Sequence, residues 1–182
     1  MVKYHSGLET VLANQQSAHN GTPDVVIAER RDVKIIQLSF FETQEALLKK
    51  ELGRFGVSDV PHFSMLKSGK LAGAARVEMG KIWLISDEMP DGCDAALYPL
   101  DLSSSRAVIR LSGLKAPEVM ARICAVDFRD KARNFYSANM HHVGVHIHHH
   151  NDSFDIYMPR SFAQSLTELL LDISCQFHVQ MA

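Results

Sequence analysis

The chain has 182 residues, of which 46% are hydrophobic, and a formal net charge of −2 at pH 7. This composition is typical of a globular protein with a core, and without a basic block or an RNA-binding motif no nucleic-acid partner is expected. No apolar run reaches the roughly 20 residues that span a bilayer, so no membrane partner is expected either.

Residues 1–24 are predicted to form a polar N-terminal arm that lacks the apolar core of a secretory signal. The three cysteines, Cys93, Cys124 and Cys175, are odd in number and widely spaced, which is typical of buried thiols in a reducing compartment. We therefore expect a cytoplasmic protein in which residues 25–182 form a single domain.

The first half of this domain, about residues 25–99, is predicted to contain one helix among three strands. These elements are a strand at Val33–Phe40, a helix at 42–53, and strands at 71–80 and 81–86. The first strand is rich in β-branched and aromatic residues, and the helix carries an apolar stripe. Gly53 is expected to cap the helix, and Met79 and Gly80 to form the turn between the last two strands.

The second half, residues 100–182, repeats this order. Its predicted elements are a strand at Ser105–Gly113, a helix at 115–126, strands at 143–150 and 153–159, and a helix at 160–177. Pro117 suits a first helical turn, and Ser161 with Gln164 matches a capping box. The chain is thus predicted to be an α+β protein of two β-α-β-β units, with helices on one face of a mainly antiparallel sheet.

The segment "MHHVGVHIHHHND" holds six of the ten histidines and lies inside the chain, so it is not a terminal tag. Apolar residues alternate on both sides of the Asn151–Asp152 turn, which predicts a β-hairpin. The expected cross-strand pairs are His150 with Ser153, His148 with Asp155, and His146 with Tyr157. The apolar side chains then share the core face, with His149 as the exception.

Two interpretations of the opposite face remain open. His146 and His148 lie on one side of their strand with Asp155 opposite, which makes a two-histidine, one-carboxylate metal site conceivable, while His142 is too far along to join. The favoured interpretation is a polar strand surface that faces water or a partner protein, because nothing in the sequence indicates a cleft or supporting groups around a metal.

Three arginines in the second half are candidates for anion binding or for contact with a partner. Arg106 and Arg110 lie on one side of their strand, where they could bind an anion but are expected to face solvent or a partner. Arg160, beside the last helix, is expected to pair with an acidic group across an interface. Ser103–Ser105 is interpreted as a capped turn and Trp83 as a core residue. There is no dinucleotide fingerprint, phosphate loop or nucleophile elbow, so no catalytic or cofactor-binding residue is predicted.

From about Leu100 to Leu171 the sequence resembles the gamma subunit of heterotetrameric sarcosine oxidase. The resemblance rests on "DLSSSRAVIRLSG", "CAVDF" and, most specifically, "MPRSFAQSL", with a looser match at "GKIWLIS". The chain departs from that family in lacking a proline before the last of these segments and in the histidine content of its hairpin.

The resemblance implies a function for the assembly rather than for this chain. That family oxidatively demethylates sarcosine to glycine, releases hydrogen peroxide, and holds FAD, FMN, NAD and tetrahydrofolate in partner subunits. It implies an aminomethyltransferase-like fold, partners of the alpha, beta and delta type, and a non-catalytic structural role here. The interface candidates are His142, His146, His148, Arg106, Arg110 and Arg160.

An alternative from another class is a free-standing folate- or metal-binding module of the same fold. Its site would be formed by His146, His148 and Asp155, or by Arg106 and Arg110.

Overall fold

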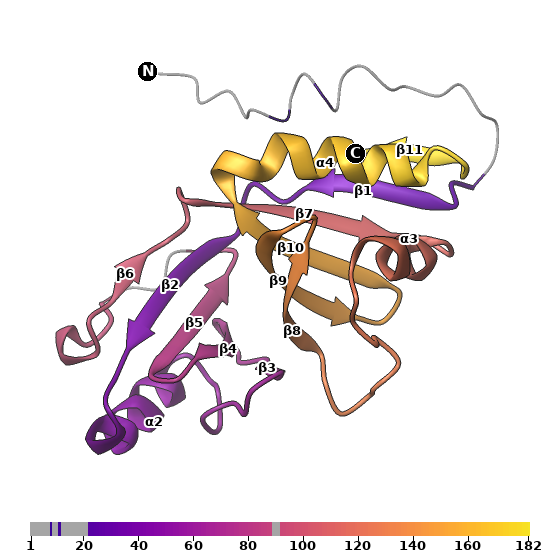
Figure 1. Ribbon diagram of the computed structural model, residues 1–182. Helices are drawn as coiled ribbons and strands as arrows, with labels where there is room; N and C mark the ends of the chain where they lie inside the picture. The colour runs from indigo at the N-terminus through magenta and orange to yellow at the C-terminus, as the bar shows by residue number, and fades with distance from the viewer. Residues whose placement is uncertain (1–7, 9–10, 12–21, 89–91) are drawn as a thin grey trace, which may run out of the picture.

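The computed structural model describes residues 8, 11, 22–88 and 92–182, and within them eleven strands form two sheets (Figure 1). Sheet A has the order β11 (Val179–Met181), β1 (Val25–Glu29), β7 (Arg106–Ser112), β10 (Ser153–Pro159), β9 (Val143–His150), β8 (Phe135–Met140). Sheet B has the order β3 (Leu66–Lys67), β4 (Gly73–Glu78), β5 (Lys81–Ser86), β2 (Lys34–Ser39), β6 (Leu100–Asp101). Among these strands β1 and β11 pair in parallel and the other neighbours are antiparallel.

Each sheet carries helices on one face. In the described part of the chain the α-helices are α2 (Glu45–Arg54), α3 (Ala116–Ile123) and α4 (Ala163–Ser174), and short 3-10 turns are η1 (Glu42–Gln44), η2 (Ala95–Leu97) and η3 (Arg160–Phe162). Helices α3 and α4 pack on sheet A, and α2 packs on sheet B. The predicted α+β class is confirmed, with two sheets. None of the helices described is long and apolar enough to cross a membrane.

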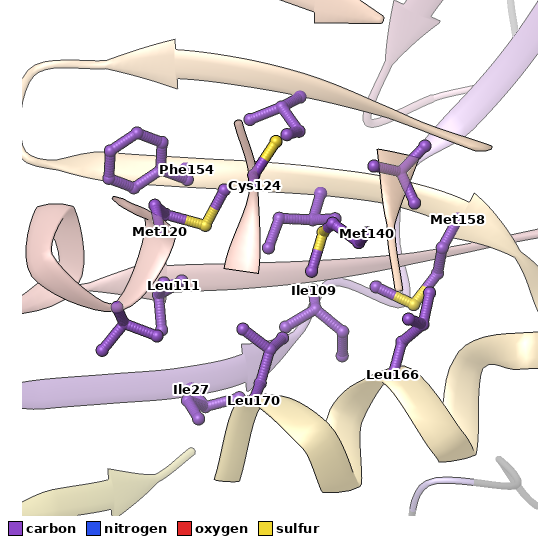
Figure 2. Close-up of a cluster of buried hydrophobic side chains, with 14 of the residues drawn as sticks. Ile27, Ile109, Leu111, Met120, Cys124, Met140, Phe154, Met158, Leu166 and Leu170 are labelled. Carbon is purple, nitrogen blue, oxygen red and sulfur yellow. The ribbon is translucent and has the colours of Figure 1, made fainter. Parts of the chain in front are cut away.

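The largest core lies between sheet A and helices α3 and α4 (Figure 2). Leu170 of α4 lies beside Ile27 and Ile109 of the sheet, Leu166 lies beside Met158, and all these side chains are at most 2% exposed. This is the apolar stripe that the helical periodicity of the last segment predicts. Leu8 is also buried in this core, and the rest of the predicted arm before residue 22, apart from Val11, lies outside the described residues.

A third cluster joins the two sheets on the faces that carry no helix. Val33, Ile35, Leu66, Ala75 and Trp83 from the sheet B side meet Val108, Phe135 and Tyr157 of sheet A. Trp83 is 2% exposed, which confirms the expectation that it is a core residue. The otherwise polar face of sheet A is therefore partly an internal surface.

Several local predictions were wrong. Gly53 does not cap α2; the helix ends at Arg54, and Gly56 takes the left-handed conformation with φ +82°. Ser161 lies in η3, so α4 starts after Phe162 without a side-chain cap. Cys124 is buried as expected, but Cys175 is exposed.

The two halves also exchange strands. β1, at the start of the first half, pairs with β7 in sheet A, and β6, at the start of the second half, pairs with β2 in sheet B. Neither β1 nor β8 was among the predicted elements. Their sequences, VVIAE and FYSANM, are short and do not alternate between apolar and polar residues, so their pairing depends on the rest of sheet A.

Candidate functional site

The histidine hairpin forms with the predicted register. In β9 and β10, His150 pairs with Ser153, His148 with Asp155, and His146 with Tyr157. Asn151 adopts φ 53° in the turn, a left-handed conformation that asparagine tolerates.

A second turn joins β8 to β9 and consists of His141 and His142, which adopt φ 46° and 70°. Both side chains are exposed at the tip of this hairpin. Of the six interface candidates, His142 is therefore one that solvent or a partner can reach.

His146 does not face outward as the alternation alone suggested. Its ring stacks on that of Trp83 in sheet B, with centroids 4.4 Å apart and an angle of 27° between the planes, and it lies 5.7 Å from the ring of Phe135. The prediction was wrong because the strand period tells the two faces of sheet A apart but not that sheet B covers the second face. His146 thus belongs to the contact between the sheets.

Burial changes the chemistry of the two inner histidines. Together with a smaller effect of the nearby charge of Arg106, it lowers the pKa of His146 from 6.5 to about 4. It also lowers the pKa of His148 to about 4, with a smaller effect from His150. Both imidazoles are therefore neutral at pH 7, because transferring a charge into a site of low polarity is unfavourable.

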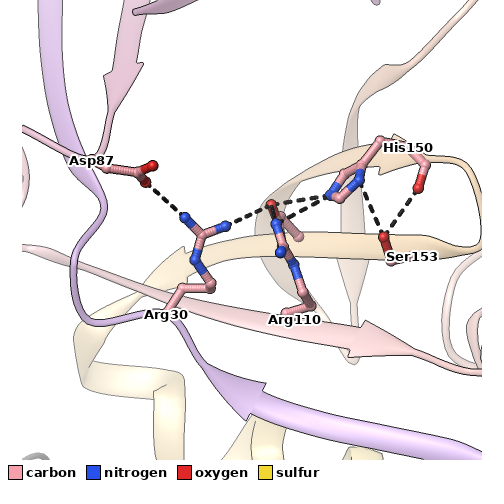
Figure 3. A network of polar contacts seen from close by, with 6 residues as sticks. Arg30, Asp87, Arg110, His150 and Ser153 are labelled. Atoms are coloured by element: carbon pink, nitrogen blue, oxygen red, sulfur yellow. Dashed lines mark hydrogen bonds and ion pairs between the residues drawn. The ribbon is translucent and has the colours of Figure 1, made fainter.

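The polar centre of this face is Asp155, which is 4% exposed (Figure 3). Arg110 binds both carboxylate oxygens: Nε donates to Oδ1 at 2.7 Å and Nη2 to Oδ2 at 2.7 Å. Arg30 Nη1 lies 3.5 Å from Oδ2, and His150 Nε2 lies 3.2 Å from the same oxygen. Ser153 Oγ holds the other side of the imidazole, 3.1 Å from Nδ1.

Opposing effects act on the carboxylate. Burial alone would raise the pKa of Asp155, but the hydrogen bonds and charge of Arg110, with those of His150 and Arg30, hold this pKa below its usual value. The same hydrogen bond raises the pKa of Arg110. The pair is therefore charged at neutral pH, as a bidentate arginine–carboxylate contact requires.

Arg30 extends this network to sheet B. It follows β1 and precedes β2, and its Nη2 donates to Asp87 Oδ1 at 2.8 Å just after the end of β5. One guanidinium thus contacts Asp155 of sheet A and an acidic residue of sheet B, next to the point where the chain crosses between them (Figure 3).

The structure brings together a different set of possible metal ligands from the set expected from the sequence. His148, His150 and Asp155 place one donor atom each within 4.8 Å of one another, whereas His146 is occupied by its stack on Trp83. Both oxygens of Asp155 are already bound by Arg110. A divalent cation would have to compete with this guanidinium and approach a second one on Arg30, which is electrostatically unfavourable.

The other two arginines are bound within the chain. Arg106 lies over the ring of Trp83, with its Cζ 5.4 Å from the centroid. Arg160 donates from Nε to the carbonyl of Ser104 at 2.7 Å and from Nη2 to that of Arg106 at 2.8 Å, and its pairing with an acidic group across an interface stays a prediction. Ser103, in the predicted turn, accepts from the backbone N–H of Ile35 at 3.0 Å.

Sequence reasoning placed His148 and Asp155 on one surface and Arg110 on a separate strand, and it missed Arg30 and Asp87; the pairing of β7 with β10 brings Arg110 to Asp155. Both missed residues lie at strand ends, and only the crossing between the sheets brings them to Asp155. His150 was the one partner with a sequence signal, since the predicted register already placed it opposite Ser153 at the end of the histidine run.

Comparison with solved structures finds proteins of the same fold, whereas comparison by sequence finds no match. No family model and no curated protein matches this chain by sequence. A chain of the structure "heterotetrameric sarcosine oxidase from Corynebacterium sp. U-96 in complex with pyrrole 2-carboxylate" matches with a TM-score of 0.82 at 20% identity, covering 96% of each chain. The glycine cleavage system aminomethyltransferase T from Bartonella henselae matches with a TM-score of 0.61 at 14% identity, covering 88% of this chain and 48% of that one.

The resemblance expected from the sequence is thus confirmed as a shared fold. A sarcosine oxidase chain and this chain have the same architecture over nearly their whole lengths, and the aminomethyltransferase shares it over about half of its length. At these identities the likeness extends to the fold alone.

Proposed function

We propose that this chain is a small non-catalytic subunit of a heterotetrameric sarcosine oxidase, in which it supports assembly. The observation that carries the proposal is the match over 96% of both chains to a member of such an assembly. A match of this extent means that the two chains share one fold over nearly all of the compared residues.

The arrangement around Asp155 supports the non-catalytic part of the proposal. A catalytic acid or base must reach its substrate and exchange a proton near the working pH. Asp155 is buried, bound on both oxygens by Arg110, and has a lowered pKa. His146 and His148 have pKa values of about 4; the imidazole of His146 stacks on Trp83, and that of His148 lies 4.8 Å from that of His150. These groups suit an internal structural role.

In this proposal the assembly demethylates sarcosine oxidatively to glycine in the cytoplasm. FAD, FMN, NAD and tetrahydrofolate are held by the larger alpha and beta subunits, a delta subunit completes the assembly, and this chain contributes residues 25–182 as one structural domain.

The test is co-expression of this chain, carrying an affinity tag, with the alpha and beta subunits encoded by the same organism. We expect a stoichiometric complex that absorbs as a flavoprotein and forms peroxide when sarcosine is added. The chain purified alone should be colourless and inactive. A flavin band or peroxide formation by the chain alone, or failure of the tagged chain to retain either large subunit, would contradict the proposal.

A second candidate is a free-standing metal- or folate-binding module, favoured by the three donors of His148, His150 and Asp155 within 4.8 Å. Calorimetric titration of the isolated chain with Zn²⁺ and, separately, with tetrahydrofolate distinguishes it from the first. Saturable binding of one equivalent of either, without any complex in the co-expression, would favour this candidate.

A further inference from the structure

Four large apolar side chains are exposed at one end of sheet B. Met79 lies in the turn between β4 and β5, Phe41 follows β2, Tyr98 precedes β6 and Leu100 lies in β6. Their exposed fractions are 78%, 66%, 60% and 52%. We call these four residues the distal patch, because β2 ends away from sheet A (Figure 1).

The sheet register brings these segments together. The rings of Phe41 and Tyr98 meet edge to face with centroids 6.4 Å apart. The backbone N–H of Phe40 donates to the carbonyl of Gly80 at 2.8 Å, which places the end of β2 beside the turn that carries Met79. The four residues therefore share one end of one sheet, unlike singly scattered apolar residues, which need no explanation.

The charged residues next to the distal patch in the sequence are acidic. Glu42 follows Phe41, Asp101 follows Leu100, and Glu78 precedes Met79. Lys81 offsets one of these charges through a contact of 2.7 Å with Glu78. An apolar centre with a charged rim is the usual anatomy of a protein–protein interface, and an excess of carboxylates calls for a partner rim of lysine and arginine.

The distal patch is also a better interface than most of the residues expected from the sequence. His146 is engaged by Trp83, Arg110 by Asp155, and Arg160 by two backbone carbonyls. Binding a partner through these groups would require breaking contacts within the chain. The distal patch exposes apolar surface whose burial is favourable without such a loss.

We propose that the distal patch is the surface by which this chain docks on a larger subunit of its assembly, at a site with an apolar centre bordered by lysine and arginine. This inference rests on the proposed function and assigns the docking to sheet B in place of the histidine strand. The edge strand β6 contributes to it, since Leu100 and Asp101 are both exposed.

The experiment compares three variants with the wild type for binding to purified alpha and beta subunits of the same organism. Phe41→Ser with Tyr98→Asn removes the aromatic pair, and asparagine suits the left-handed backbone of Tyr98, φ 43°. Leu114→Ser is the matched control, because Leu114 is 82% exposed but lies outside sheet B, in the loop between β7 of sheet A and helix α3. Glu42→Lys tests the charge of the rim.

We expect the double variant to bind at least tenfold more weakly with an unchanged thermal midpoint, and the Leu114 control to bind like the wild type. Glu42→Lys should bind more weakly at low salt, with the difference shrinking as salt screens the charges. Equal binding of the wild type and the double variant would overturn this inference while leaving the proposed function intact, and a wild type that binds neither subunit would overturn both. A dimer of the isolated chain that the double variant abolishes would assign the patch to a second copy and also overturn the inference.

Discussion

Protonation of His146 should weaken the contact between the two sheets. This imidazole stacks on Trp83 and lies near Arg106, and its pKa is about 4 in the folded chain against 6.5 for an ordinary histidine. Between these two values the unfolded chain binds more protons than the folded chain. Stability must therefore fall as the pH is lowered through this window.

The size of the effect follows from the two pKa values. A shift from 6.5 to about 4 costs the folded state roughly 2 kcal/mol at pH 5 and almost nothing at pH 7.5. His148, whose pKa burial and the charge of His150 lower to about 4, adds to this loss. For a protein with a total stability of about 5–15 kcal/mol, such a loss is readily measured.

The assay is urea denaturation at pH 7.5 and at pH 5, followed by fluorescence of Trp83, the only tryptophan of the chain. His146→Gln removes the titrating group; it should be less stable than the wild type at pH 7.5, because an aromatic stack is lost, but should lose roughly 2 kcal/mol less on going to pH 5. Equal losses in the two proteins would refute the reasoning and mean that His146 is not buried between the sheets.

Three further results are expected. Leu170→Ala should lower the free energy of unfolding by about 2–5 kcal/mol, and Leu169→Ala by less, because Leu170 is fully buried while Leu169 is only partly buried. Equal urea midpoints for the two variants would contradict the packing of α4. Arg110→Met should lower the free energy of unfolding by about 3–5 kcal/mol at pH 7, since it leaves the charge of Asp155 buried without its main partner. The double variant Arg110→Met with Asp155→Leu should recover part of that loss, and thermal denaturation of both variants measures the difference. The wild type should bind no Zn²⁺ at micromolar concentration, whereas Arg110→Met should bind it more tightly because the competing guanidinium is gone; tight binding by the wild type in calorimetry would show that the ion pair does not exclude a metal.

The hairpin could be predicted to the residue, because strand alternation and the Asn151–Asp152 turn fix its register locally. The stripe of α4 followed from helical periodicity for the same reason. What covers the second face of sheet A could not be predicted, since the Trp83–His146 stack joins residues far apart in sequence through two separate sheets. The contact of Arg30 with Asp87 near Asp155 could not be predicted either, because residues at strand ends carry no periodic signal.

The exchanged strands bear on how this chain can be divided. A fragment ending near residue 99 would lack β6 from sheet B and would leave β1 without β7. The complementary fragment would lack β1, which lies between β11 and β7 in sheet A. Each fragment would then expose unpaired backbone along a strand that is covered in the intact chain, which favours aggregation. Separate expression of the two halves should therefore give insoluble products that become soluble when co-expressed.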